Sequence, residues 1–412
     1  MVSLMRAVFW ISTAWLAYVY GGYPLILWMF GAIRKVRFRG GDEYLPYVSV
    51  LISARNEEKD VAWKTAETLS WDYPSDRLEV LIASDASEDR TEEVLSSISD
   101  PRLRWIANRR RLGKNLSLNM LSKLASGELL FFTDANSHIA PHCLRAMTRH
   151  FADARVGCVT SCERPERSFA DGGMACGGSL YQRYESWLNS LEHRIGSVLT
   201  CDGSIFCIRR DFFAPLDPDL ANDLELPLRI GARGYATLYE PSAYSVERAT
   251  SSAREEFRRR RRICAQGFLA VWRLRAALRG LRGWQFVSRK LMRWLALVPF
   301  VLATVSNIFL ARHSLFFACV LSPQTAFYWL ALVGWRRNAT GGNTNRLASV
   351  LFYFLLAHSA ALIGVLETCC GRRFSCWESA ALSRGSEVTA TGNTFSAAVD
   401  GLVGLRNAGS GR

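Results

Sequence analysis

Residues 7–30 contain no charged side chain, an apolar run of 24 positions near the N-terminus. At the rise of an α-helix this length crosses the hydrocarbon core of a bilayer. The run is too long and too aromatic for the core of a signal peptide, and no small-residue cleavage site follows it. We therefore expect residues 1–36 to form an uncleaved anchor, which Pro24 kinks but does not prevent.

A basic cluster follows the anchor at 34–39, with the sequence RKVRFR. By the positive-inside rule it holds the next domain in the cytoplasm, so we expect a multi-pass protein of the inner or plasma membrane. Further apolar stretches at about 294–311, 314–335 and 347–366 predict spans within 294–370. Four crossings would place the tail outside, whereas Arg372 and Arg373 favour the inside. Either one C-terminal segment is re-entrant or interfacial, or the charge bias is overridden.

The net charge of +14 is concentrated before these spans. From Arg254 to Arg293 there are 13 Arg or Lys residues and two Glu residues. Because this segment, 251–293, ends at an apolar span, we interpret it as basic and interfacial, in contact with anionic membrane lipids. Nucleic acid is the disfavoured alternative, since no nucleic-acid-binding motif accompanies the charge. The tail, 371–412, is rich in Ser, Gly, Thr and Ala without periodicity, which predicts disorder.

Residues 45–250 alternate short apolar runs with helical stretches. The expected strands are Val48–Ser53, Leu78–Ser84 and Glu128–Thr133, and the expected helices are Glu57–Leu69, Ser87–Ile98 and Lys114–Leu124. This alternation predicts an α/β domain with a mostly parallel sheet.

Polar and acidic residues follow each expected strand, in the segments ARNEE, DASED and DAN. Ligands of open α/β sheets bind beyond the carboxyl ends of the strands, so these segments should converge at one edge. Asp134 and Asn136 offer two hard oxygen ligands for Mg²⁺ or Mn²⁺. Lys114 is expected at a helix N-terminus, where it either faces solvent or lies near phosphates.

Asp223 opens a short helix, in the segment NDLELPLR. Sugar transfer with inversion needs a carboxylate that removes the proton from the attacking hydroxyl, and Asp223 is the candidate base. The alternative is that Asn222 or Asp223 merely caps the helix.

The chain resembles the membrane-bound family 2 glycosyltransferases with a GT-A fold, of the cellulose and hyaluronan synthase-like superfamily. The resemblance covers residues 48–267 and rests on the order and spacing of the motifs VSVLISARNEE, LEVLIASDASED, RRLGKN, GELLFFTDANS, CDGSIFCIRRDFF, NDLELPLRIGARGYATLYEP and REEFRRRRRICAQG. It implies a nucleobase contact by Asp85 with Asn56 and Glu57 nearby, metal and diphosphate binding by Asp134 and Asn136, a base at Asp223, and an acceptor pocket at Gly203 and Ser204.

Two positions depart from the family pattern. Asn136 replaces the second aspartate of D-x-D, and Arg259–Ile263 stands where processive members carry Q-x-x-R-W. Arg259 and Arg262 remain expected donor-site residues, and Arg262 can stabilise the diphosphate. The missing Trp removes an aromatic platform for the acceptor sugar, so we expect transfer of one or a few sugars.

The sequence thus predicts an inverting, metal-dependent hexosyltransferase that uses a nucleotide-diphosphate sugar, UDP-linked, and a saccharide or lipid-linked acceptor in polysaccharide or glycolipid synthesis. One alternative is a polyprenyl-phosphate glycosyltransferase, whose phosphate nucleophile needs no strong base. Another is an inactive scaffold subunit among polysaccharide-assembly partners.

Overall fold

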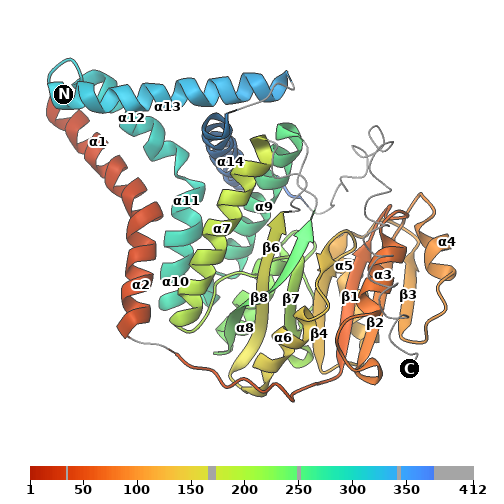
Figure 1. Cartoon of the computed structure of the whole chain (residues 1–412). Coiled ribbons are helices and arrows are strands. Elements are labelled where there is room, and N and C mark those ends of the chain that lie inside the picture. Colours follow the sequence, from red (N-terminus) through yellow and green to blue (C-terminus); the bar gives the residue numbers. More distant parts are fainter. Residues whose placement is uncertain (34–35, 166–172, 248–251, 341–344, 375–412) are drawn as a thin grey trace, which may run out of the picture. The chain divides into compact units, whose positions relative to one another are not determined.

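Four parallel strands form one half of an eight-stranded sheet in the computed structural model, which describes residues 1–33, 36–165, 173–247, 252–340 and 345–374 (Figure 1). They are β1 (Val48–Ala54), β2 (Leu78–Asp85), β3 (Leu103–Asn108) and β4 (Leu129–Asp134), in the order β3-β2-β1-β4. Every residue of β1 and β2 is buried, as expected for parallel strands covered by helices on both faces. The intervening helices are α3 (Val61–Leu69), α4 (Thr91–Ser96) and α5 (Lys114–Leu124).

The other half of the sheet is mixed. It consists of β7 (Ile205–Arg209), β6 (Val156–Pro165), β8 (Ala236–Glu247) and β5 (His138–Ile139), in that order beyond β4. Strand β7 runs antiparallel to both β4 and β6, while β6 and β8 are parallel. The predicted α/β domain is confirmed, and the additional strands were not predicted from the sequence.

Alternate side chains of the strands enter two separate cores. Val50, Ile52 and Phe131 pack in the core on one face of the sheet, and Leu51 and Phe132 pack in the core on the other. This period of two follows from the pleat of a strand. The remaining helices of this part of the chain are α6 (Cys143–Thr148), α7 (Gly173–Arg194), α8 (Asn222–Ala232) and α9 (Ala253–Arg273).

Three helices in the described part of the chain are long and apolar enough to cross a membrane. They are the N-terminal helix Val2–Ile33, α13 (Leu315–Ala339) and α14 (Arg346–Cys369). A fourth candidate is a pair, Leu281–Trp294 and Leu297–Leu310, bent by 57° at its break. This pair comprises α10 (Leu281–Phe286), a π-helical turn (Val287–Leu291), α11 (Met292–Trp294) and α12 (Leu297–Leu310).

The N-terminal helix consists of α1 (Val2–Ala17), a π-helical turn (Tyr18–Gly22) and α2 (Tyr23–Ile33). Pro24 is the second residue of α2, and the preceding Tyr23 amide donates to the Tyr18 carbonyl five residues back. Proline has no amide hydrogen to donate and its ring crowds the preceding turn. A π-helical turn therefore immediately precedes α2, at the position where the sequence predicts a kink.

The bent pair runs antiparallel to the N-terminal helix along most of its length. Successive contacts join Tyr23 to Trp284 with ring centroids 5.0 Å apart, Tyr18 Oη to Ser288 Oγ at 2.8 Å, Trp15 Nε1 to the Met292 carbonyl at 3.1 Å, and Phe9 to Leu310 in one buried cluster. The bent pair and the N-terminal helix therefore lie side by side from Tyr23 to Phe9.

Many cations of the basic segment form internal ion pairs, which the sequence did not predict. The pairs are Arg259 with Glu163 and Glu247, Arg260 with Glu256, Arg261 with Glu367, Arg273 with Asp217 and Asp219, Arg289 with Glu185 and Glu192, and Arg293 with Glu185. Except for Glu256, which is four residues from Arg260, the carboxylate partners lie outside the basic segment, so the charge surplus read along the chain is largely neutralised locally. The predicted contact with anionic lipids is left to exposed cations such as Arg258. The predicted disordered tail lies, from residue 375 on, outside the described residues.

Candidate active site

Asp85 and Asp134 lie on either side of the carboxyl end of β1. In the sheet register Ala54 pairs with Ser84, the residue before Asp85, and Ser53 pairs with Asp134. Parallel strands end at a common edge, so the predicted convergence of the first two aspartates follows from the order β2-β1-β4.

The loops after β1 and β2 are joined by side-chain hydrogen bonds. Asn56 Oδ1 accepts from the Glu88 amide at 2.8 Å, and the Asn56 amide donates to Ser87 Oγ at 3.2 Å. Asn56 and Ala86 both have φ of 52°, a left-handed conformation that costs a non-glycine residue roughly 1–2 kcal/mol. Glu57 is buried, and its amide donates to Thr91 Oγ1 at 2.9 Å. Asn56 and Glu57 thus shape the loop beside Asp85.

Asp85 is buried, and its carboxylate fixes the loop that leads into α5. Its two oxygens accept from the Leu112 and Gly113 amides, each at 2.8 Å, and from Asn108 Nδ2 at 3.1 Å. Gly113 has φ of 90°, a conformation that favours glycine. Asp85 therefore determines where α5 begins, and with it the position of Lys114.

Lys114 connects the two sides of the site. Its Nζ lies 2.5 Å from Asp134 Oδ1 and 3.3 Å from the Gly203 carbonyl oxygen. The Lys114 and Asp134 side chains are 20% and 19% exposed, so solvent and small ligands reach the pair. Lys114 is also the first residue of α5, where the helix dipole adds positive potential. Its predicted place near an anion is consistent with this geometry.

The chemistry of Asp134 and Asn136 fits a divalent cation that shares its ligands with a substrate. Asn136 is partly exposed, and its side chain has no hydrogen-bond partner among the described residues. The described residues contain no group of three or more His, Cys, Asp and Glu side chains that could hold a metal. One carboxylate and one amide oxygen bind Mg²⁺ or Mn²⁺ best together with phosphate oxygens, the usual arrangement for these ions.

Asp223 stands in the first turn of α8, against Gly203. The Cys201 amide donates to the Asp223 backbone carbonyl at 2.8 Å, and a Cβ placed on Gly203 would lie 3.6 Å from Asp223 Oδ2. Burial raises the pKa of Asp223 above its usual value, while the positive charge of Lys114 opposes that rise. Asp134 also acts on this pKa, so Asp134, Lys114 and Asp223 lie within electrostatic reach of one another.

Helix α9 contributes Arg262 to the same group. Burial and the neighbouring Arg259 lower the pKa of Arg262 to about 10, and the carboxylates of Asp134 and Asp223 oppose this. Arg262 is therefore within electrostatic reach of two of the residues around Gly203, Asp134 and Asp223. Arg259 is directed to other partners, Glu163 at 3.3 Å and Glu247 at 3.9 Å. These partners occupy Arg259 in the structure, and its predicted contact with the donor stays a prediction.

Sequence reasoning missed a second set of carboxylates, Glu163, Asp202 and Glu247. Glu163 and Glu247 become neighbours only because β6 and β8 pair with Glu163 opposite Ser245. Burial, with Glu163 nearby, raises the pKa of Asp202 to about 6. Asp202 accepts from the amide and hydroxyl of Ser204, at 3.1 and 2.7 Å. The only sequence signal was the position of Asp202 in the CDGS segment.

Ser204 itself is 3% exposed, and its hydroxyl also lies 2.6 Å from Ser245 Oγ. Its side chain therefore supports the turn at 202–204. Of Gly203 and Ser204, only Gly203 faces the site. Its carbonyl accepts from Lys114, and its lack of a side chain leaves space beside Asp223.

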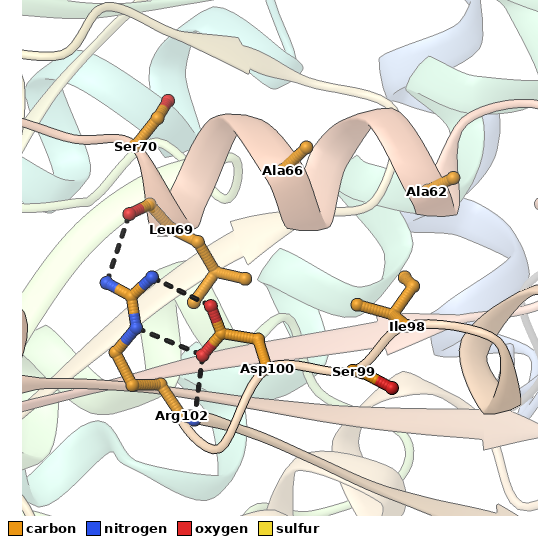
Figure 2. A pocket seen from close by; sticks show the side chains of 8 residues that line it. All are labelled: Ala62, Ala66, Leu69, Ser70, Ile98, Ser99, Asp100 and Arg102. Atoms are coloured by element: carbon orange, nitrogen blue, oxygen red, sulfur yellow. Dashed lines mark hydrogen bonds and ion pairs between the residues drawn. The ribbon is translucent and has the colours of Figure 1, made fainter.

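A cavity of about 450 Å³ lies away from these residues (Figure 2). Its lining includes Leu69 at the end of α3 and Arg102 just before β3. The cavity therefore lies at the amino ends of the parallel strands, opposite the carboxyl ends that carry Asp85 and Asp134. In Figure 2 the Arg102 guanidinium points to the Asp100 carboxylate and the Leu69 carbonyl, and these bonds occupy it. The cavity offers no group for the chemistry described above.

Comparisons with known proteins identify the family. The model described as "Glycosyl transferase family group 2" matches residues 129–359, and that described as "Glycosyl transferase family 2" matches residues 49–195. A mannosyltransferase, PcManGT from Pyrobaculum calidifontis in complex with GDP-Man and Mn²⁺, superposes with a TM-score of 0.66 at 21% identity, over 87% of this chain and 99% of that one. This likeness shows a shared GT-A fold.

Curated relatives include a beta-monoglucosyldiacylglycerol synthase of Trichormus variabilis, 25% identical over 45% of this chain and 41% of the relative. The probable glycosyltransferase YdaM of Bacillus subtilis is 26% identical over 55% and 56%, and an N-acetylglucosaminyltransferase of Rhizobium leguminosarum bv. phaseoli is 24% identical over 50% and 51%. The chain spans about half the length of the curated relatives it matches. Because the model described as "Glycosyl transferase family group 2" covers more than half of its residues, the chain belongs to that family.

Proposed function

We propose that the chain transfers a hexose, with inversion, from a nucleotide-diphosphate sugar, UDP-linked, to a hydroxyl of a saccharide or lipid-linked acceptor at a membrane. The observation that carries this proposal is the arrangement around Gly203, where Lys114 contacts Asp134 and Gly203 while Asp223 stands against the same glycine. An anion-binding cation and a buried carboxylate thus face one small space. The acceptor class is supported by the names of two relatives, a beta-monoglucosyldiacylglycerol synthase and an N-acetylglucosaminyltransferase.

The residues divide the reaction between them. Asp223 removes the proton as the acceptor hydroxyl oxygen bonds to the anomeric carbon, and the bond between that carbon and the diphosphate oxygen breaks. Lys114 and Arg262 neutralise the negative charge that develops on the departing nucleoside diphosphate. A divalent cation held by Asp134 and Asn136 would add to this neutralisation. Asp85, by fixing the start of α5, keeps Lys114 in place.

The raised pKa of Asp223 suits this role, because a base works best when its pKa approaches the pH at which the enzyme operates. Replacing Asp223 with Asn removes the proton acceptor while keeping the shape of the side chain. We expect transfer to fall at least about a hundredfold with nucleotide affinity unchanged. The exposed Asp211, replaced with Asn, is the matched control and should keep parental activity.

The test uses purified protein in nanodiscs with a panel of radiolabelled nucleotide sugars, followed by separation of lipid and polymer products. No transfer with any donor, together with no metal-dependent UDP binding by calorimetry, would favour the scaffold alternative.

A phosphate acceptor is the second candidate, because three cations, Lys114, Lys290 and Arg262, lie within electrostatic reach of Asp223. A lipid phosphate is already ionised and needs no base. Substantial transfer by the Asp223→Asn variant would therefore favour a polyprenyl-phosphate acceptor over a hydroxyl.

For the membrane arrangement, the proposal places the catalytic domain in the cytoplasm and lets the N-terminal helix and the bent pair cross together. Their antiparallel contacts from Tyr23 to Phe9 support a broken span rather than a re-entrant loop. In this proposal α13 lies along the far surface of the membrane and does not cross it, so three segments cross and the end of α14 lies on the side of the catalytic domain. Its support is the contact with α9, where Gln266 Nε2 donates to the Phe374 carbonyl at 2.7 Å and Thr368 Oγ1 donates to the Ala265 carbonyl at 3.3 Å.

A further inference from the structure

Glu192, in the last turns of α7, is completely buried and contacts three separate segments. Its Oε1 accepts from the Tyr23 hydroxyl at 2.5 Å, and its Oε2 accepts from Arg289 Nη1 at 2.7 Å and from the Leu199 amide at 3.1 Å. Tyr23 belongs to the N-terminal membrane helix and Arg289 to the bent pair. Leu199 belongs to the loop that ends at the turn 202–204.

That loop leads directly to the candidate base. The Cys201 amide, two residues after Leu199, donates to the Asp223 carbonyl at 2.8 Å. Gly203 then supplies the carbonyl that Lys114 contacts and the open space beside the Asp223 carboxylate. Glu192, which bonds to both membrane segments, is thus linked to Asp223 through the short backbone stretch from Leu199 to Cys201.

The bent pair holds the same loop at a second point. Gln285, on α10, is 1% exposed and donates through Nε2 to the Ser197 carbonyl at 3.0 Å. On its other side the loop is joined to the sheet, since the Val198 amide donates to the Thr237 carbonyl at 2.9 Å. The loop 197–204 therefore lies between the sheet and the membrane segments.

A buried ion pair adds little stability compared with well-packed apolar side chains, because burying both charges costs about as much as their attraction returns. Arg289 is 2% exposed, and its second partner, Glu185, lies 2.9 Å from Nη2. Glu185 already offers Arg289 a carboxylate, so neutralising the guanidinium does not by itself require Glu192. What Glu192 adds is its bonds to Leu199 and Tyr23.

We propose that Glu192 is a positioning residue, which holds the loop 197–204, and so Gly203 opposite Asp223, in a fixed relation to the two membrane segments. This inference rests on the proposed function, because it concerns the acceptor side of that site. The consequence is that a lipid-borne acceptor, whose depth is set by the bilayer, meets a base whose position is set by the same helices. We expect donor binding to change little in Glu192 variants, because Asp85 holds the start of α5 through another loop and the contact of Lys114 with Asp134 does not involve residues 197–204.

Glu192→Gln is the first test, because the amide keeps the shape but loses one acceptor oxygen. Glu185→Gln is the matched control, since Glu185 lies on the same helix and pairs with the same arginine but does not contact the loop. Hydrogen–deuterium exchange of the amides at 197–204 should be at least about tenfold faster in Glu192→Gln and unchanged in Glu185→Gln. Equal exchange in Glu192→Gln and the parent would overturn the proposal.

Transfer kinetics supply the second readout. A displacement of about 1 Å costs up to a hundredfold in rate, so kcat should fall roughly ten- to a hundredfold in Glu192→Gln while the affinity for UDP stays constant. Glu185→Gln should stay within about threefold of the parent. A similar loss of kcat in both variants, or faster exchange without loss of kcat, would reduce Glu192 to a structural residue and overturn the proposal.

A triple variant keeps the test valid if Glu192→Gln does not fold. Tyr23→Phe, Glu192→Met and Arg289→Met together remove the buried polar partners and leave no unpaired charge at these positions. Loop exchange and kcat should change as in Glu192→Gln. If the parent transfers no sugar at all, the proposed function fails by itself, and the exchange measurement still supports or overturns the attachment of the loop.

Discussion

Lys114 Nζ lies 2.5 Å from Asp134 Oδ1, at the point where a divalent cation and a diphosphate are expected to bind. Lys114 neutralises the negative charge of Asp134, which would otherwise repel the carboxylate of Asp223 nearby. When a diphosphate enters, Lys114 can exchange a carboxylate for phosphate oxygens without loss of charge pairing. In the proposed function, Asp134 would then be available to hold the cation that accompanies the nucleotide.

Replacing Lys114 with Met should therefore have opposite effects on the two ligands. Affinity for UDP should fall roughly tenfold to a hundredfold, because a hydrogen bond to a charged group contributes about 1.5–3 kcal/mol. Affinity for Mn²⁺ in the absence of nucleotide should rise, because Asp134 loses its cationic partner. Calorimetry measures both, and the exposed Lys123→Met on the same helix is the control. A parallel loss of both affinities would contradict the exchange.

Replacing Arg262 with Gln should slow the chemical step. Arg262 lies within electrostatic reach of Asp134 and Asp223, and the proposed function assigns it to the charge that develops on the departing diphosphate. Loss of one such group typically costs about a hundredfold in kcat, with a smaller effect on the KM of the donor. Steady-state kinetics test this against Arg258→Gln, an exposed arginine one turn earlier on α9. Equal rates in the two variants would remove Arg262 from the site.

The pH profile should show the raised pKa of Asp223. Only the ionised carboxylate accepts a proton, so kcat should fall as the pH drops through this pKa. Because burial raises the pKa, the fall begins at a higher pH than for an exposed aspartate, whose pKa is about 3.9. The measurement is kcat between pH 4 and 8 at saturating donor, and the residual activity of Asp223→Asn should lack this limb. An identical limb in the variant would assign it to another group.

Asp202 predicts a pH dependence of stability. Burial raises its pKa to about 6 in the folded chain, from about 3.9 in an unfolded one. The folded state therefore holds the proton more tightly, and the contribution of Asp202 to stability is full below about pH 4 and is lost as the pH rises through 6. Asp202→Asn should gain stability relative to the parent over that interval, by roughly 3 kcal/mol at most. Thermal unfolding in nanodiscs from pH 4 to 8 measures it, and a constant difference would contradict it.

Natural cysteines can locate the end of α14. Cys369 and Cys370, at the end of α14, are exposed. Cys319 is also exposed but lies in the first turns of α13. In a variant with Cys176 and Cys376 replaced by Ser, a membrane-impermeant maleimide should label Cys369 and Cys370 in inside-out vesicles and not in intact cells. Labelling of these two residues from the outside would place the end of α14 across the membrane.

The local pattern of the sequence determined much of this protein. The uncharged run at 7–30 and the strands ending at Ala54, Asp85 and Asp134 were predictable because burial, strand period and helix length leave their mark on neighbouring residues. Helix α5 begins at Lys114 and ends at Leu124, as predicted, since Gly113 and the apolar spacing are local signals. The family followed from motifs whose order is visible in the chain.

Tertiary structure decided which of these residues act together. Nothing in the spacing links Glu192 to Leu199, Tyr23 and Arg289, because those contacts arise only when α7 packs between the two membrane segments and the loop. The basic segment looked like a surface for lipids, yet arginines such as Arg259 pair with carboxylates nearly a hundred residues away. Charge pairing depends on distance in space, and the sequence records only distance along the chain.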